Sequence, residues 1–424
     1  MMLAPADLTV DLLLAARATP ASLAARQDAR WRALLRAAAA GSSHFRDLLA
    51  GRDPDATPLS ALPPSSKSAL MADFAGWVTD PALKLQPLRA FARDRTRIGE
   101  PWLGRYAVWA SSGSTGEPAL FVQDEQALAV YDALETLRRD IPRPWQRWLD
   151  PWLLTERVAF VGAIDGHFAS EVMMRRLRRA HPWRAANWRS FSIMQPMDAL
   201  VAQLDAFGPT VLATYPTAAV LIAEQARAGR LRARLQECWT GGETLTPAMR
   251  AAIEQGLACT LRNSYGASEF LPIAWECAQG RLHVNADWVI LEPVDEMGRP
   301  VPPGQPSHTT LLTNLANHVQ PIIRLDIGDR ITRHESACGC GCTLPTIDIE
   351  GRDDEVLSLP GADGRAVPML PLALVTALED DAGVSAFCLD QPGPRRWRLR
   401  LEPGTDDAVV TRCRTVLRGL ARAQ

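Results

Sequence analysis

The chain has 424 residues, of which 47% are hydrophobic and 22% charged, and its formal net charge is −2 at pH 7. A chain of this length can fill two or three hydrophobic cores. The near-neutral charge argues against a nucleic-acid-binding protein, and no apolar run approaches the ~18 residues of a membrane span. Its eight cysteines are too few for a disulfide scaffold, so we expect a cytoplasmic protein.

Residues 1 to 90 have the spacing of amphipathic helices. The first residues include a short apolar stretch, but Asp7 and Asp11 stand where a signal peptide carries positive charge. We therefore expect these helices to pack on the body of the protein. The helical part ends in the proline-rich segment LSALPPSSKSALMADF at 59–74.

Short apolar strands then alternate with helical segments. Strands are predicted at 157–164, 210–216, 235–240 and 259–265, and helices at 124–140, 217–231 and 248–257. This alternation indicates an α/β fold with largely parallel sheets, in which ligands bind beyond the carboxyl ends of the strands.

The character of the sequence changes twice after this region. Residues 282–335 are rich in strand formers with Pro and Gly turns, as in a small β-barrel. After 351–353, a helix at 368–383, two strand-like segments and a last helix predict a small α+β lid. We therefore predict a large body over 1–350, with 1–90 as its mainly helical lead-in, and a short C-terminal lid over 351–424.

A Ser/Gly-rich stretch, ASSGSTGEPALF, occupies residues 110–121. Its backbone N–H groups and hydroxyls can wrap phosphate oxygens, since glycines allow a close approach. It lacks the Gly-Lys-Ser/Thr ending of a Walker A loop. Taken alone, the stretch is equally well explained as a flexible linker.

Four further motifs follow this stretch in order. They are TGGE at 240–243, YGASE at 265–269, LLTNLANHVQPIIRLDIGD at 311–329 and CGCGCTLPTIDIEGRDD at 338–354. Together with SSGSTGEP they resemble the motifs of the adenylate-forming superfamily. The last two resemble its phenylacetate–coenzyme A ligase-like branch, as does LPPSSKSALMADF at 62–74. The resemblance extends over residues 55–355.

This resemblance implies a ligase that uses ATP and Mg²⁺ to convert a small carboxylic acid into an acyl-adenylate. The acyl group then passes to the thiol of coenzyme A or of an acyl carrier protein. Because the branch favours aryl and arylacetic acids, an aromatic acid is the first expectation. A non-catalytic nucleotide- or acyl-binding relative and an amide-forming ligase stay as alternatives, and a homodimer is left open.

The resemblance also implies roles for individual residues. The phosphates are assigned to a run of loop residues: Ser111, Ser112, Gly113, Ser114, Thr115 and Gly116. The rest of the nucleotide is assigned to Gly242 and Glu243 at the adenine, Tyr265 and Gly266 beside it, and Asp329 at the ribose hydroxyls.

Three further residues are assigned to catalysis and two to the acyl pocket. Ser268 is expected beside the phosphate and acyl group, Glu269 at Mg²⁺, and Arg352 at the ribose or phosphate. Tyr215 and His167 are expected in the acyl pocket. Each residue also has an ordinary structural explanation, such as a surface histidine for His167, and only the order of the motifs favours the functional assignment.

Cysteine and histidine spacing indicates a metal site. Cys277 and His283 form a C-x₅-H pair, and Cys338, Cys340 and Cys342 alternate in ACGCGC. Thiolate and imidazole are the ligands that tetrahedral Zn²⁺ prefers. Cys338 and Cys340 match cysteines of the branch, so the predicted ligands of a structural zinc are Cys277, His283, Cys338 and Cys340, with Cys342 as a substitute. Buried thiols without a metal are the alternative.

One feature departs from the resemblance. The superfamily usually places a lysine near the end of its mobile C-terminal domain, between the carboxylate and the α-phosphate, and this chain has no lysine after Lys84. Three explanations stay open. An arginine such as Arg395, Arg396 or Arg398 substitutes for the lysine, the adenylation step proceeds without that cation, or catalysis has been lost.

Overall fold

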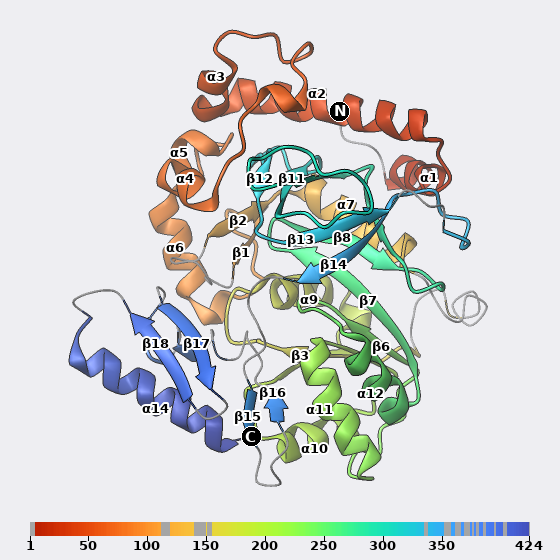
Figure 1. Ribbon diagram of the computed structural model, residues 1–424, viewed down its shortest axis with the longest axis vertical. Coiled ribbons are helices and arrows are strands. Elements are labelled where there is room, and N and C mark those ends of the chain that lie inside the picture. The colour runs from red at the N-terminus through yellow and green to blue at the C-terminus, as the bar shows by residue number, and fades with distance from the viewer. Residues whose placement is uncertain are drawn as a thin grey trace. The chain divides into compact units, whose positions relative to one another are not determined.

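The computed structural model describes residues 5–111, 119–139, 150, 155–334, 338–351, 358–360, 366–368, 374, 377–378, 381–384, 387–393, 396–401 and 405–423. The chain forms two compact units (Figure 1). The first contains Met1–Trp109, Leu120–Leu149 and Arg262–Arg352, and the second contains Ala110–Ala119, Asp150–Leu261 and Asp353–Gln424. Within the described residues, no helix has the length and hydrophobicity needed to cross a membrane.

Helices open the first unit, as the spacing of residues 1–90 predicts. They are α1 (Pro5–Ala15), α2 (Pro20–Gly41), α3 (Ser43–Leu49), α4 (Lys67–Ala72), α5 (Phe74–Trp77) and α6 (Leu85–Arg93), with 3₁₀ turns η1 (Leu59–Ala61) and η2 (Arg95–Arg97). Helix α2 begins where Thr19 accepts a hydrogen bond from the Ser22 amide and where Pro20 occupies the first turn. Its buried face carries Trp31, Leu34 and Leu35.

The strands of the first unit pair antiparallel. One sheet has the order β13 (Arg330–His334), β14 (Thr346–Gly351), β9 (Leu282–Val284), β8 (Phe270–Glu276) and β7 (Thr260–Ala267). The segment predicted as a small barrel contributes β9 and β13 to this sheet. It also forms a separate antiparallel sheet of β10 (Val289–Val294), β11 (Thr309–Asn314) and β12 (Leu325–Asp326). The short pair β1 (Ala107–Ala110) and β2 (Leu120–Gln123) precedes helix α7 (Glu125–Leu137).

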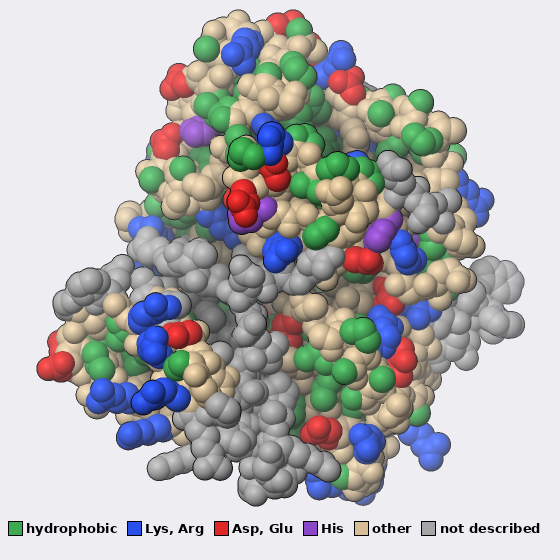
Figure 2. Space-filling view, viewed as in Figure 1, with side chains coloured by type: hydrophobic (Ala, Val, Ile, Leu, Met, Phe, Trp, Pro, Cys, Tyr) green, Lys and Arg blue, Asp and Glu red, His purple; other side chains and the backbone are tan. Residues whose placement is uncertain are grey.

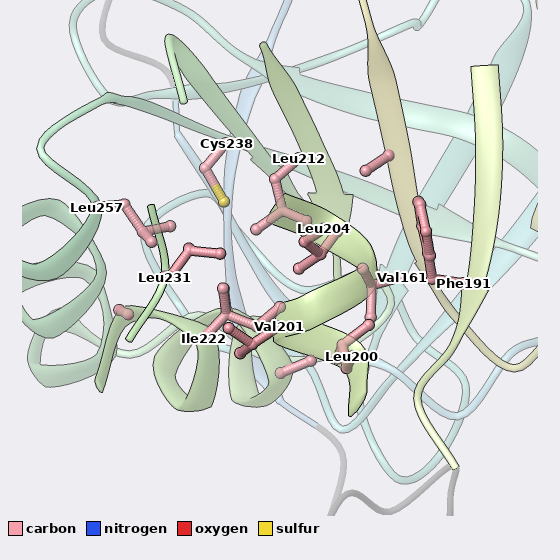
Figure 3. Packing of buried hydrophobic residues seen from close by; sticks show 14 of the residues in the cluster. Val161, Phe191, Leu200, Val201, Leu204, Leu212, Ile222, Leu231, Cys238 and Leu257 are labelled. Carbon is pink, nitrogen blue, oxygen red and sulfur yellow. The ribbon is translucent and has the colours of Figure 1, made fainter. Parts of the chain in front are cut away.

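The second unit contains the parallel α/β layers that the alternation predicts. Strands β4 (Trp188–Ser192), β3 (Val158–Gly162), β5 (Val211–Thr214) and β6 (Glu237–Thr240) lie side by side in that order and run parallel. Helices α9 (Ala169–Ala180), α10 (Met197–Phe207), α11 (Pro216–Arg227) and α12 (Pro247–Leu257) accompany them, and η3 (Pro182–Arg184) follows α9. Figure 3 shows the core between strands and helices, where Val161, Leu212 and Cys238 meet Leu204 and Ile222.

The C-terminal residues have mixed α+β structure. They include the strand pairs β15 (Ser358–Pro360) with β16 (Ala366–Pro368) and β17 (Phe387–Gly393) with β18 (Arg396–Leu401), and helix α14 (Asp407–Ala423). Leu378, Ala382, Val384 and Cys413 form the buried centre of a small core. The division into a body over 1–350 and a lid over 351–424 stays a prediction.

Candidate functional site

The YGASE motif lies at the tip of a hairpin in the first unit. Strand β7 ends at Ala267, Ser268 and Glu269 form the turn, and β8 begins at Phe270. The sequence predicts a strand that runs into an open loop, so this tight antiparallel return differs from the expectation. Gly266 is required in it, because a Cβ there would lie 2.0 Å from the Leu271 carbonyl oxygen.

Two side chains hold this turn in place through its backbone. The indole N–H of Trp109 donates to the Ser268 carbonyl at 2.9 Å, and the Asn314 amide donates to the Glu269 carbonyl at 2.9 Å. Asn314 belongs to the TNL motif and is fully buried. The motif therefore fixes the geometry of the hairpin that carries Glu269.

Glu269 forms an ion pair that the sequence did not predict. Its side chain is 2% exposed, and its Oε1 lies 2.7 Å from Nζ of Lys67. Lys67 is the first residue of α4, in the segment that resembles the ligase-like branch. A buried carboxylate requires a compensating charge, and Lys67 supplies it. The signal that could have identified Lys67 is its rarity, since Lys67 and Lys84 are the only lysines of the chain.

The YGASE and IGD motifs meet in the same unit. The Tyr265 hydroxyl donates to Oδ2 of Asp329 at 2.6 Å, and both side chains are buried. Thr310 of β11 donates its hydroxyl to the Asp329 carbonyl at 2.8 Å. Asp329 therefore lies in the same unit as Tyr265 and the rest of the YGASE motif, although it follows that motif by about 60 residues along the chain.

Three other predicted residues gather in the second unit. The Thr217 amide and hydroxyl, at the start of α11, donate to Oε2 of Glu243 at 3.1 and 2.6 Å. Burial raises the pKa of Glu243. Gly242 has a φ of +81°, and a Cβ there would lie 3.2 Å from the Tyr215 ring, so glycine suits the turn on both counts.

Tyr215 and His167, predicted for the acyl pocket, are both buried. Burial raises the pKa of Tyr215, and the charges of Glu243 and Glu171 raise it further. His167 is 3% exposed, so the alternative of a surface histidine is wrong. Its carbonyl accepts a 2.8 Å hydrogen bond from the Ala110 amide at the base of the Ser/Gly stretch. A role in the acyl pocket stays a prediction for both residues.

Of the predicted phosphate loop, the structure describes Ser111. Its amide donates to the Ala119 carbonyl at 2.9 Å, and its hydroxyl accepts from the Ala119 amide at 3.0 Å. These two bonds join the ends of the loop. The other predicted loop residues, Ser112, Gly113, Ser114, Thr115 and Gly116, and also Arg352, lie outside the described residues.

The four predicted zinc ligands come together in the first unit. Cys277 follows β8, His283 lies on β9, and Cys338 and Cys340 precede β14. The ligand atoms of these residues all lie within 4.8 Å of one another. Cys342 is not in this group, which contains only described residues.

The distances within this group match a tetrahedral zinc site. Two Sγ atoms bound to zinc at about 2.3 Å stand roughly 3.8 Å apart in a tetrahedron. The Cys277 and Cys338 sulfurs are separated by 3.6 Å, and Cys340 Sγ lies 3.3 Å from His283 Nε2. The His283 Nδ1 is hydrogen-bonded to the Leu344 carbonyl at 2.9 Å, which leaves Nε2 for a metal. The residues therefore fit Zn²⁺.

Comparisons with known proteins agree with these observations. Residues 107–308 match the model of the family described as AMP-binding enzyme. A phenylacetate–coenzyme A ligase from Thermus thermophilus is 26% identical over 269 residues, which cover 60% of this chain and 56% of that protein. The match thus spans about half the length of that curated relative.

Solved structures share the fold. A 2-hydroxyisobutyryl-CoA ligase in complex with 2-HIB-AMP and CoA has a TM-score of 0.61 at 19% identity, covering 96% of this chain and 85% of that one. The same ligase in its postadenylation state has a TM-score of 0.58 at 19% identity, covering 93% and 82%. Residues 107–308 therefore match the AMP-binding enzyme family, and the chain shares the fold of a solved CoA ligase.

Proposed function

We propose that the protein activates a carboxylic acid with ATP and passes the acyl group to a thiol. The substrate carboxylate attacks the α-phosphate, and the bond to pyrophosphate breaks. The acyl-adenylate is then cleaved by a thiolate with release of AMP. The observation that carries the proposal is the meeting, in one unit, of Lys67 and Glu269 with the Tyr265–Asp329 pair.

The C-terminal part of the chain has no lysine, and Lys67 supplies a positive charge in its place. Phosphoryl transfer depends on positioning and on stabilising negative charge at the phosphate oxygens. Lys67 Nζ stands 2.7 Å from Glu269, and its side chain is 26% exposed, so it can still reach a ligand. In this role Lys67 makes the adenylation step independent of a lid lysine.

Glu269 is suited to Mg²⁺, because this ion is held by one or two carboxylates together with phosphate oxygens. When bound, the ion neutralises charge on the phosphates. Glu269 orients that site, since its backbone is held by Asn314 and its side chain by Lys67. Asp329 accepts hydrogen bonds from the ribose hydroxyls, and Tyr265 holds the Asp329 carboxylate in position.

The acyl substrate is an aromatic acid, and its acceptor is coenzyme A or a carrier-protein thiol. The curated relative is a phenylacetate–coenzyme A ligase, which supports an arylacetic or related acid. The buried ring of Tyr215 offers a flat wall for such a group. Zn²⁺ on Cys277, His283, Cys338 and Cys340 has a structural role, since four protein ligands leave no open position.

Pyrophosphate release with a panel of aryl and arylacetic acids tests the proposal. Lys67→Met should reduce the adenylation rate by ~10²-fold or more, a typical loss for one preorganised charge. Lys67→Arg keeps a positive charge next to Glu269 but changes its geometry. This variant therefore separates an effect on the position of the charge from a failure to fold. Lys84→Met is the matched control, because Lys84 is exposed at the start of α6 and should leave the rate unchanged.

The alternatives give different results in the same assay. A parent protein that binds ATP but releases no pyrophosphate with any acid would support the non-catalytic relative and contradict the proposal. Product analysis with coenzyme A, a phosphopantetheinylated carrier protein and simple amines separates thioester formation from amide formation. Equal rates for the parent and Lys67→Met would remove Lys67 from the mechanism.

A further inference from the structure

The outer strand of the C-terminal sheet has two different faces. Along β18 the side chains of Trp397, Leu399 and Leu401 are half-buried, whereas Arg396, Arg398 and Arg400 are exposed. Leu399 and Leu401 pack against the small core that includes Cys413, Val416 and Leu417 of α14. The α14 side of this sheet is thus apolar, and the opposite side carries a row of three guanidinium groups.

Asp390 on β17 forms ion pairs with this row, at 3.7 Å to Arg398 and 3.8 Å to Arg400. The side chains of Arg398 and Arg400 stay 56% and 61% exposed. Residues 385–424 contain eight arginines and four acidic residues, although the whole chain has a net charge of −2. Figure 2 shows basic side chains gathered at the lower left, over this part of the chain.

We propose that the arginine row of β18 docks the acidic helix of a phosphopantetheine-bearing carrier protein. The inference rests on the proposed function and names the acceptor of its second step. Alternate residues of a strand repeat at about 6.6 Å, and residues four apart on a helix repeat at about 6 Å. Arg396, Arg398 and Arg400 therefore face glutamates or aspartates at every fourth position of one helix.

The arrangement of the row favours a protein partner over a free nucleotide. Small polyphosphates are held by donors that converge in a concave site. These guanidiniums instead stand in line on the exposed face of a two-stranded sheet. Arginine pairs with carboxylates through two parallel N–H bonds, which fixes the register of a helix as well as its affinity.

Binding of a synthetic helical peptide with glutamates four residues apart tests the docking face directly. The parent should bind it better than the matching glutamine peptide, and added salt should weaken the complex. Arg396→Gln combined with Arg398→Gln should weaken binding by roughly 5- to 10-fold, since exposed pairs contribute little individually. Asp390→Asn should tighten binding, because it removes the opposing charge.

Arg414→Gln combined with Arg418→Gln is the matched control, since both side chains are exposed on α14. An equal loss in both double variants, or equal binding of the glutamine peptide, would overturn the proposal. The same measurements with coenzyme A and with phosphatidylglycerol vesicles complete the test. If coenzyme A or the vesicles bound through Arg396 and Arg398 more tightly than the glutamate peptide does, that probe would identify the partner in place of the carrier protein.

Acyl transfer gives the functional readout. The Arg396 and Arg398 double variant should raise the KM for a phosphopantetheinylated acidic acyl carrier protein and leave the KM for coenzyme A unchanged. Pyrophosphate release without acceptor reports the adenylation step separately, so a failure of the proposed function appears in the parent protein. Loss of pyrophosphate release in the double variant would assign the row to adenylation and contradict docking.

Discussion

Asp329 is the residue that we propose binds the ribose hydroxyls of the nucleotide. It is buried, and Tyr265 donates to one of its carboxylate oxygens at 2.6 Å. Asp329→Ala should weaken the affinity for ATP or AMP by ~1.5–3 kcal/mol, the usual contribution of a hydrogen bond to a charged acceptor. Isothermal titration calorimetry checks this change. Tyr265→Phe is the companion variant, because it keeps the Asp329 carboxylate and should weaken the nucleotide affinity less. An unchanged nucleotide affinity for Asp329→Ala would contradict the ribose assignment.

Glu243 predicts a pH dependence of stability. Burial raises its pKa above the ordinary value of 4.5, because the ionised form loses water, and the Thr217 hydrogen bonds offset part of this rise. The folded state therefore favours the protonated carboxyl, and the stability this contributes is lost as the pH rises through the folded-state pKa. Glu243→Gln should raise the Tm at about pH 7.5 and leave it unchanged at about pH 4. The same increase at both values would show that ionisation of Glu243 is not the cause.

At the residue scale, the sequence did not predict which contacts the assigned residues make. Glu269 was assigned from the YGASE motif, but its ion pair with Lys67 was not expected. The two residues are distant along the chain, and no local pattern links a lysine at a helix start to a hairpin turn. The burial of His167 was likewise not predicted, because burial of a single loop residue depends on tertiary packing.

Among the elements, the parallel strands were predicted well. The predicted strands at 157–164 and 210–216 contain β3 (Val158–Gly162) and β5 (Val211–Thr214), because short apolar runs between turn residues are a strong local signal. The return of β7 into β8 was not predicted. Of its turn residues, Glu269 is not a typical turn former, and the Trp109 and Asn314 side chains that hold the turn come from distant segments.

The predicted zinc ligands lie in the hairpin of β8 and β9 and in the loop before β14. His283 faces Trp275 on one side and Thr346 on the other, so a metal there would tie the loop at 338–345 to this sheet. The purified protein should carry about one equivalent of zinc, and Cys338→Ser should lower the metal content and the Tm together. Cys342→Ser is the control, since Cys342 is outside the cluster. Protein without metal by elemental analysis, after purification without chelator, would contradict the site.

On the scale of the whole molecule, the two compact units alternate along the chain. Each is assembled from three separate segments. A local reading of composition can find places where the character of the sequence changes, such as 351–353, but it cannot detect units whose segments are joined only by tertiary contacts. The boundary between Arg352 and Asp353 coincides with such a change, and it also starts the last segment of the second unit.

The last prediction concerns removal of everything after Arg352. Among the described residues, the hydrophobic core that includes Leu378 and Cys413 draws its members from this C-terminal segment, and the core of the parallel sheet contains none of them. The shortened protein should therefore fold. Because Lys67 and Glu269 lie before the cut, pyrophosphate release should retain much of its rate, whereas transfer to a thiol should collapse. Single-turnover assays with a cognate acid separate the two steps, and circular dichroism and ATP binding confirm the fold. If an arginine of GPRRWRLR had replaced the lid lysine, the shortened protein would fold and bind ATP but form no adenylate, and that result would overturn the role given to Lys67.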